Sequence, residues 1–374
     1  MPPSPPNPFR IAGELLPGEM IDRDEEAARL LSLAEGGHSS RLVAPRRYGK
    51  TSILRRVLHE ASEAAWATAL VDLEGVLSLS SVVVRIERAY DRALKGSVRR
   101  TVDALFRAWQ VGLSLGAGGF TASLQSNPKL DVETVLLRLL DLPAKLHERS
   151  GVRSLVAFDE FQDLLRVDGA DGILRSVLQH QTGVASYAFS GSAPTLMKRL
   201  FEDPSRPLLE HAVPVELGPL PLDATAAHLE QRFGATGRGM GTALDPLLAF
   251  TRGHPQRTML VAHQLWELVP AGGVADEGTF VEARTRALAH AEPALRARWE
   301  ALTVNEQRVS VALATRRSGG LYSGETLRLL GLKKGSIDRA LAGLLGKAEA
   351  HAGAGGPTLT DPLLEHWLSE RGVF

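Results

Sequence analysis

The stretch Arg41-Leu42-Val43-Ala44-Pro45-Arg46-Arg47-Tyr48-Gly49-Lys50-Thr51-Ser52 decides how the chain is expected to fold. Its apolar start, residues 41–44, predicts a strand, and apolar residues three and four apart over residues 51–63 predict a helix. Between them lies A-P-R-R-Y-G-K-T, the pattern of a phosphate-binding loop with alanine in the first glycine position. Strand, loop and helix follow in the required order, so a chance Gly-Lys-Thr is the weaker explanation.

Each residue type in this loop suits a nucleotide. Backbone N–H groups of the loop and of the following helix N-terminus surround an anionic phosphate. Gly49 allows close approach, Lys50 reaches the β- and γ-phosphates and assists catalysis, and the Thr51 hydroxyl ligates Mg²⁺. We therefore predict that ATP binds here, through Ala44, Pro45, Arg46, Arg47, Tyr48, Gly49, Lys50, Thr51 and Ser52.

Two carboxylates follow a second apolar run, Leu155-Val156-Ala157-Phe158. In a parallel sheet, the carboxyl end of a strand faces the crevice where ligands bind. Asp159 is therefore predicted to hold Mg²⁺, and Glu160 to act as general base on an attacking water. A solvated Asp-Glu pair is the alternative, and Asp163 is expected to cap the next helix or face solvent.

A third run, residues 187–189, ends in Ser190-Gly191-Ser192. The Ser192 hydroxyl is a candidate catalytic group that senses the γ-phosphate or positions water. A plain glycine-serine turn is an equal alternative.

Alternation of strands and helices predicts the fold class, an α/β parallel sheet with helices on both faces. Further strands are expected over residues 67–73 and 212–217, and further helices over 81–95 and 132–149. Between residues 221 and 290 only helices are expected, over 223–233, 245–251, 255–269 and 279–290. The predicted domains are a proline-rich arm or strap (1–20), a P-loop core (21–220), a helical lid (221–290) and a C-terminal module (291–374).

The C-terminal module has the pattern of a winged helix-turn-helix. Thr303 and Glu306 form a capping box, helices are expected over 324–330 and 334–346, and a glycine-rich hairpin over 350–360 precedes a last helix at 362–371. If the second helix entered a DNA groove, its contacts would be Lys333, Lys334, Ser336 and Arg339. The module holds 11 Lys+Arg against 9 Asp+Glu, a weak basic footprint, so docking of a protein partner stays an equal alternative.

Composition narrows the class of protein. The 374 residues carry 43 Lys+Arg and 43 Asp+Glu, so a protein that coats nucleic acid is disfavoured. The absence of cysteine excludes disulfides and thiolate metal sites. No apolar run reaches the roughly 18 residues that span a bilayer, and residues 111–124 predict a strand or hairpin, so we expect no membrane partner and a cytoplasmic location.

Four segments together resemble the archaeal-type STAND/AAA+ P-loop ATPases, which are related to origin-recognition ATPases and carry a winged helix after a helical lid. The segments are APRRYGKTS (44–52), LVAFDEFQDLL (155–165), FSGSAPTLMKRLF (189–201) and DPLLEHWL (361–368). NPFR (7–10) and IDRDEE (21–26) resemble that family's lead-in, with Asp22-Arg23-Asp24 in place of a G-R-E box. The resemblance implies ATP, Mg²⁺, a nucleotide-dependent conformational change and assembly into homo-oligomers.

The resemblance also points to two further positions. Residues 251–257 resemble the family's G-x-P turn, which implies that Arg257 reaches a phosphate, with a simple helix-breaking turn as the alternative; His254 is expected to be packed. His211 stands where the family has an arginine that acts at the nucleotide, so Arg199 and Arg206 remain as candidates for that role, although a solvated surface arginine is the favoured interpretation of each.

These patterns favour a Mg²⁺-dependent ATPase whose ATP or ADP state switches assembly or partner binding. Two alternatives stay open: a DNA-binding regulator for which ATP is mainly a structural ligand, and a protein-interaction scaffold that docks through the winged helix. A small-molecule kinase is disfavoured, because nothing resembles an acceptor pocket.

Overall fold

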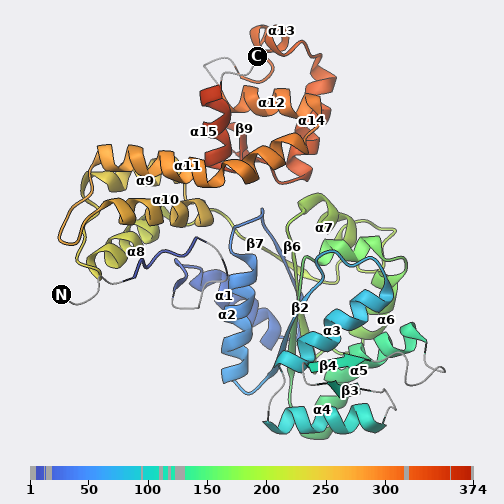
Figure 1. Cartoon of the computed structure of the whole chain (residues 1–374). Helices are drawn as coiled ribbons and strands as arrows, with labels where there is room; N and C mark the ends of the chain where they lie inside the picture. The colour runs from blue at the N-terminus through green and yellow to red at the C-terminus, as the bar shows by residue number, and fades with distance from the viewer. Residues whose placement is uncertain are drawn as a thin grey trace. The chain divides into compact units, whose positions relative to one another are not determined.

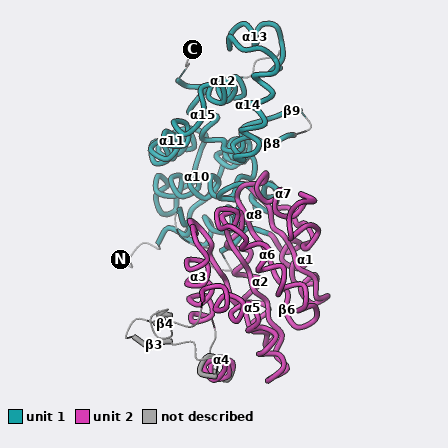
Figure 2. The backbone as a smooth tube through the Cα atoms, turned by 90° about the vertical axis from the view of Figure 1, so that its right-hand side faces the viewer, with its two compact units in different colours: residues 1–22, 45–49, 218–374 teal, residues 23–44, 50–217 magenta. Residues whose placement is uncertain are grey.

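The structure, a computed structural model, describes residues 6–11, 13, 19–93, 96–108, 113–116, 119–122, 131–315, 320–353 and 355–371. The chain forms two compact units (Figure 2). The sheet unit comprises Arg23–Ala44 and Lys50–Leu217, and the helical unit comprises Met1–Asp22, Pro45–Gly49 and Gly218–Phe374.

The sheet unit is built on five parallel strands in the order β2-β5-β6-β1-β7. These are β1 (Ser40–Val43), β2 (Ala67–Asp72), β5 (Ser154–Asp159), β6 (Ala185–Gly191) and β7 (Val213–Glu216). Because all pairs are parallel, the carboxyl ends of the five strands lie at one edge of the sheet. The α/β fold expected from the sequence is confirmed.

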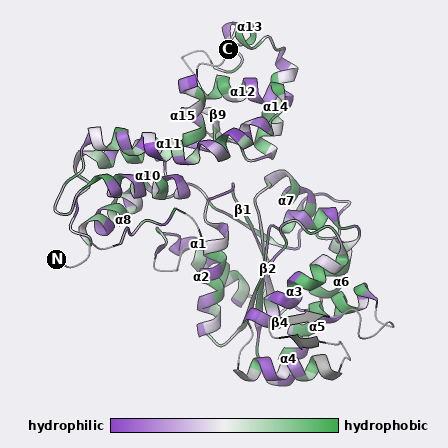
Figure 3. Ribbon diagram, in the orientation of Figure 1, coloured by the Kyte–Doolittle hydropathy of each residue, from purple (hydrophilic) through white to green (hydrophobic). Residues whose placement is uncertain are grey.

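Helices cover both faces of this sheet (Figure 1). Helices α1 (Asp24–Glu35) and α2 (Lys50–Glu63) lie on one face, and α3 (Leu79–Ala93), α5 (Val132–Ser150) and α6 (Ala170–Leu178) lie on the other. The buried residues of α2, among them Ile53, Leu54, Val57 and Leu58, recur at three- and four-residue spacing. This apolar stripe explains why the helix packs on the sheet. Hydrophobic and hydrophilic residues likewise alternate along the helices of both units (Figure 3).

Two smaller elements follow α3: helix α4 (Gly96–Ala108) and a hairpin of β3 (Leu113–Gly116) and β4 (Gly119–Ala122). The two strands pair antiparallel, which confirms the hairpin expected over residues 111–124. Residues 111–112, 117–118 and 123–124 of that stretch lie outside the described residues.

The helical unit begins with α8 (Leu222–Gly234), α9 (Leu244–Thr251), α10 (Pro255–Leu268) and α11 (Glu277–Glu300). The prediction that the last of these ends at His290 is wrong, because α11 continues through Pro293. Ala291 and Leu295, on either side of that proline, are buried in the core of the unit. Their burial outweighs the one backbone hydrogen bond that proline removes.

The C-terminal elements are α12 (Val304–Ala314), α13 (Gly324–Leu330), α14 (Lys334–Gly346), β8 (Ala350–Gly353), β9 (Gly356–Leu359) and α15 (Pro362–Arg371). Thr303 and Glu306 form the expected capping box at the start of α12. The order of elements is the expected one, and the assignment as a winged helix stays a prediction, as do the domain boundaries.

Residues 7–9 of the N-terminal stretch are fixed to the helical unit. Asn7 donates to the backbone oxygen of His263 at 3.2 Å, and Phe9, 1% exposed, packs against Phe233 with ring centroids 5.3 Å apart. His263 Nδ1 lies 2.7 Å from the backbone oxygen of Phe9. Of the two expectations for the N-terminal stretch, an arm or a strap, residues 7–9 fit the strap. Residues 1–5 lie outside the described part of the chain.

None of the helices that the structure describes is both long enough and apolar enough to span a bilayer.

A buried carboxyl makes the stability of the sheet unit depend on pH. Glu87 of α3 is 5% exposed, and within the described residues its Oε1 has no hydrogen-bond partner. Burial raises the pKa of Glu87 from its ordinary 4.5 to about 7. Because this pKa is higher in the folded chain than in the unfolded chain, its stabilising contribution is complete below pH 4.5 and is lost as the pH rises through 7.

We therefore expect the free energy of unfolding of the wild type to fall relative to that of Glu87→Gln by roughly 2 kcal/mol between about pH 5 and pH 8. Urea unfolding of both proteins across this pH range measures the difference, and the glutamine variant serves as control because it does not titrate. Parallel curves for the two proteins would contradict the assignment.

Candidate functional site

The loop between β1 and α2, predicted to bind phosphate, has two residues in the left-handed region. Gly49 has φ 86°, and Arg47 has φ 67°. A Cβ added at Gly49 would meet no atom within 4 Å, so space does not restrict this position. Glycine is favoured here because of the left-handed φ. Ala44 keeps a negative φ, and the alanine in the first glycine position is therefore tolerated.

The lysine and hydroxyl residues of the motif open α2. Lys50 is 5% exposed, and its Nζ donates to the backbone oxygen of Ala44 at 3.0 Å. The ammonium group therefore lies over the start of the loop. Thr51 and Ser52 follow in the first turn of the helix, and both are half-buried.

Thr51 and Asp159, predicted as Mg²⁺ ligands from positions 108 residues apart, meet in the sheet unit. Thr51 Oγ1 donates to Asp159 Oδ2 at 2.5 Å, and Asp159 is 6% exposed. Among the described residues, no group of three or more acidic or histidine side chains can hold a metal by itself. A hydroxyl beside one carboxylate suits Mg²⁺ when nucleotide phosphates and water complete the coordination shell.

Glu160 and Ser192, predicted as catalytic, also lie together. Ser192 Oγ donates to Glu160 Oε2 at 2.6 Å. Glu160 has φ 48°, a left-handed conformation that costs on the order of 1 kcal/mol. Its backbone N–H donates to Asp159 Oδ1 at 3.0 Å, so the two carboxylates are held in one arrangement.

The contacts of Gln162 and Asp163, which follow Glu160 in the sequence, were not predicted correctly. Gln162, which was missed, donates from Nε2 to Glu160 Oε2 at 2.5 Å. The prediction that Asp163 caps a helix or faces solvent is wrong: it is 8% exposed, and its Oδ2 accepts the Gly75 N–H at 2.7 Å. The closeness of Gln162 to Glu160 in the sequence was the available signal, whereas Gly75, the partner of Asp163, lies 88 residues away.

In the helical unit, the turn before α10 is tightly built. An added Cβ at Gly253, whose φ is 72°, would lie 2.3 Å from the backbone oxygen of Leu220. His254 caps α10, with its Nδ1 accepting the Arg257 N–H at 3.4 Å, and is 3% exposed, as expected for a packed residue. Burial lowers the pKa of His254 to about 4, so its imidazole is neutral. Its ring lies edge-on to that of Tyr48, with centroids 5.0 Å apart.

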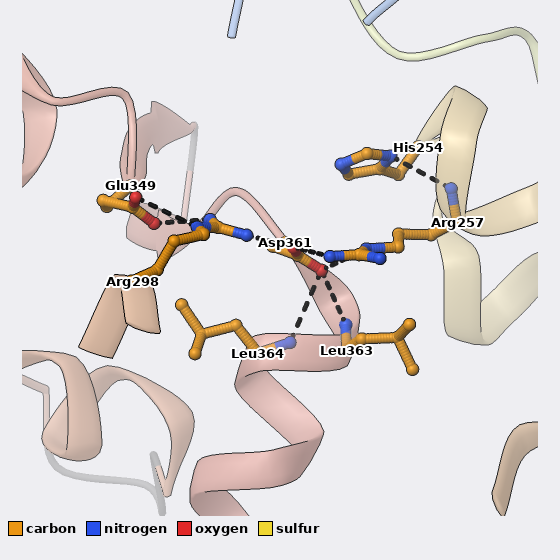
Figure 4. Close-up of polar contacts among 7 residues, drawn as sticks. All are labelled: His254, Arg257, Arg298, Glu349, Asp361, Leu363 and Leu364. Carbon is orange, nitrogen blue, oxygen red and sulfur yellow. Dashed lines mark hydrogen bonds and ion pairs between the residues drawn. The ribbon is translucent and has the colours of Figure 1, made fainter. Parts of the chain in front are cut away.

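Arg257, predicted to reach phosphate, is bound to a carboxylate in the structure (Figure 4). Its Nε and Nη2 donate to Asp361 at 2.9 and 2.5 Å, and the side chains of the two residues are 1% and 3% exposed. Arg298 also donates to Asp361, at 2.6 Å, and pairs with Glu349 at 2.5 Å. Burial opposes ionisation of Asp361, but Arg257 and Arg298 hold its pKa well below the ordinary value.

Arg47 of the loop adds a third positive charge to this cluster. Partial burial lowers the pKa of Arg47, and so do Arg257 and Arg298 nearby. Arg257, Arg298 and Arg46 all lower the pKa of Arg47 and Asp361 raises it, so positive charge is in excess around this side chain. This excess beside the loop favours an anion there.

His211, Arg206 and Arg199, the positions considered for an arginine that acts at the nucleotide, have different surroundings. His211 lies against Arg175, and burial followed by the charge of Arg175 lowers its pKa to about 4. Arg206 pairs with Asp171 at 3.1 Å. Arg199 of α7 (Pro194–Phe201) is exposed and remains the candidate.

The residues predicted for DNA contact lie at the start of α14. Lys333, Lys334 and Arg339 are exposed, and Ser336 is half-buried. Lys334 Nζ lies 5.8 Å from the ring centroid of Tyr322, which is 43% exposed. Cations beside an exposed aromatic ring form a surface that suits an anionic partner.

Comparison with solved structures identifies the fold. The chain is similar to the Walker-type ATPase of Pyrococcus abyssi, with a TM-score of 0.72 and 18% identity over 96% of this chain and 99% of that one. It is also similar to the ORC2 protein of Aeropyrum pernix, solved in ADPNP–ADP complexes, with a TM-score of 0.61 and 15% identity over 96% and 95% of the two chains. No family model and no curated protein matches the sequence. The likeness confirms, for the fold, the resemblance to archaeal P-loop ATPases related to origin recognition.

The Arg257–Asp361 cluster gives a test of stability. Asp361→Asn leaves the buried guanidinium group of Arg257 facing a neutral amide, while the half-buried Arg298 keeps Glu349. Removing one partner of a buried ion pair costs about 3–5 kcal/mol. We expect this loss in the free energy of unfolding, measured by urea denaturation. Glu282→Gln, which breaks the exposed pair with Arg286 on α11, is the matched control and should leave the unfolding midpoint near that of the wild type. Equal midpoints for the two variants would contradict the role assigned to Asp361.

Proposed function

We propose that the chain is a Mg²⁺-dependent ATPase whose nucleotide state controls assembly or the binding of a partner. One observation carries the proposal: the hydroxyl that follows the Gly-Lys of the loop is hydrogen-bonded to the first of two carboxylates at the end of β5. A Thr51–Asp159 pair at the carboxyl edge of a parallel sheet is the arrangement that Mg²⁺ and nucleotide phosphates require. The ADPNP–ADP complexes of the Aeropyrum pernix ORC2 protein, which has a similar fold, support a nucleotide as the ligand.

In the proposed reaction, the loop residues 44–52 bind the phosphates of ATP. Lys50 exchanges the backbone oxygen of Ala44 for the more strongly attracting phosphate oxygens. Thr51 and Asp159 would hold Mg²⁺, which would supply positive charge to offset that of the phosphates. Glu160 accepts a proton from water as the water oxygen attacks the γ-phosphorus and ADP leaves, and Ser192 keeps the Glu160 carboxylate in place.

The switching part of the proposal rests on Arg257. A phosphate at the loop would compete with Asp361 for the Arg257 guanidinium, which lies close to Arg47. Exchange of Arg257 between the two anions would link the bound nucleotide to residues 291–374, which we propose to be a winged helix. On this view residues 1–20 are a strap, 21–220 the ATPase core and 221–290 the lid of a STAND-type switch, which assembles into homo-oligomers.

Two substitutions separate binding from hydrolysis. Lys50→Ala should abolish ATP binding, because the buried ammonium is the main cation of the loop. Glu160→Gln should bind ATP with the affinity of the wild type and hydrolyse it about 10²–10⁴ times more slowly, because the general base is lost. Fluorescent-nucleotide titration measures the first effect and phosphate release the second.

Lys145→Gln, on the exposed surface of α5, is the control, with the binding and turnover of the wild type expected. Hydrolysis by Glu160→Gln at the rate of the wild type would show that Glu160 is not the base.

DNA binding is a second candidate function, favoured by the exposed cations of α14. Each phosphate neutralised by a cation lowers the slope of log K against log salt by about 0.9. Replacing Lys333, Lys334 and Arg339 by glutamine should therefore make the slope shallower by roughly 2–3, because three phosphate contacts are lost. Fluorescence anisotropy of a labelled duplex over a salt series measures it, with Lys145→Gln as control.

If the triple variant keeps the slope of the wild type, or if the wild type binds no DNA at low salt, DNA recognition by this surface is refuted. A protein partner of the C-terminal module would then be the remaining alternative.

A further inference from the structure

Gln162 closes a ring of hydrogen bonds around Glu160. Its Nε2 donates to Glu160 Oε2 at 2.5 Å, and its Oε1 accepts the Ser192 N–H at 3.3 Å. Ser192 Oγ in turn donates to the same Glu160 oxygen at 2.6 Å. Both ends of the Gln162 amide are therefore used, and one carboxylate oxygen of Glu160 receives two donors.

The backbone of Gln162 is held on both sides. Phe161, fully buried, packs against Phe189 of β6 with ring centroids 4.5 Å apart, and Asp163 accepts the Gly75 N–H at 2.7 Å. Gln162 itself is 6% exposed, so its amide has little freedom to leave these partners. A side chain with this little freedom can fix the orientation of the group to which it donates.

The neighbouring strand makes room for Gln162. A Cβ added to Gly191 would lie 2.6 Å from Gln162 Oε1 and 2.4 Å from Met197 Sδ. Gly191 does not have a positive φ, so the reason for glycine here is space and not backbone conformation. The turn at the end of β6 therefore admits the glutamine side chain between Glu160 and Ser192.

We propose that Gln162 is a positioning residue that fixes the Glu160 carboxylate for catalysis. The inference rests on the proposed ATPase function and deepens it. With Oε2 of Glu160 engaged by Gln162 and Ser192, Oε1 has no partner among the residues that the structure describes and is left to accept a proton from water in the proposed reaction. Binding of the nucleotide does not depend on this ring, because Gln162 belongs neither to the loop nor to the Thr51–Asp159 pair.

The test compares Gln162→Met with Gln181→Met. Gln181 is a matched control because it is also buried, at 2% exposed, and its amide is also used at both ends, by Leu140 and Tyr187. It lies before β6, at the opposite end of that strand from Ser192. We expect Gln162→Met to lower kcat by about 10- to 100-fold, with KM and nucleotide affinity within about two-fold of the wild type. Gln181→Met should keep kcat, even where its melting temperature falls as much.

A double variant distinguishes positioning from a structural role. If Gln162 acts through Glu160, adding Gln162→Met to Glu160→Gln should leave the residual rate unchanged. A further fall by the same factor as in the wild-type background would overturn the inference, and so would an unchanged kcat in Gln162→Met. Gln162→Glu, of nearly equal size, replaces the methionine variant if that one does not fold, and the same loss is expected because it no longer donates to Glu160.

Failure of the proposed function is recognised separately. A wild-type chain that does not hydrolyse ATP, or Glu160→Gln at the rate of the wild type, refutes the proposed function and this inference with it. A wild type that hydrolyses ATP through Glu160, together with Gln162→Met at full kcat, refutes this inference alone.

Discussion

The parallel pairing of β5, β6 and β1 is the constraint on which the rest of the sheet unit depends. Phe158 pairs with Phe189, and Val43 pairs with Gly191, so three strands far apart in the sequence end at one edge. Their interiors are apolar: Leu42, Phe158 and Phe189 are at most 1% exposed. Because a shift of one residue would turn each strand's side chains to the opposite face, the register is strongly specified. The Thr51–Asp159 hydrogen bond and the Glu160–Ser192 contact are consequences of that register.

In each unit, one carboxylate receives several hydrogen-bond donors. In the sheet unit, Gln162 and Ser192 both donate to a single oxygen of the half-buried Glu160. In the helical unit, Arg257 and Arg298 donate to the buried Asp361. Each set of donors fixes the geometry of a carboxylate as well as stabilising its charge. The two clusters differ in their donors. The donors to Glu160 are a neutral amide and a neutral hydroxyl, whereas two guanidinium groups keep Asp361 ionised.

Local patterns in the sequence predicted the elements, and non-local pairing limited the rest. The Gly-Lys-Thr loop, the apolar strand ends and the Thr303–Glu306 capping box were found because their signals lie within a few residues of one another. The contact of Gln162 with Ser192 gave no such signal, because the two residues are 30 positions apart. Arg257 was expected at a phosphate for a related reason: its partner Asp361 lies 104 residues further along the chain. The continuation of α11 past Pro293 depends on packing that no helix-stop rule contains.

The position of Asp361 bears on whether Arg257 can change partners. Besides the two arginines, Asp361 Oδ1 accepts the N–H groups of Leu363 and Leu364 at the start of α15, at 3.0 and 3.4 Å. If Arg257 left for a phosphate, Asp361 would keep Arg298 and both backbone donors, so it would not become an uncompensated buried charge. The departing guanidinium would likewise gain a charged partner. In the proposed switch, exchange between the two anions would therefore replace one charge-assisted pair by another.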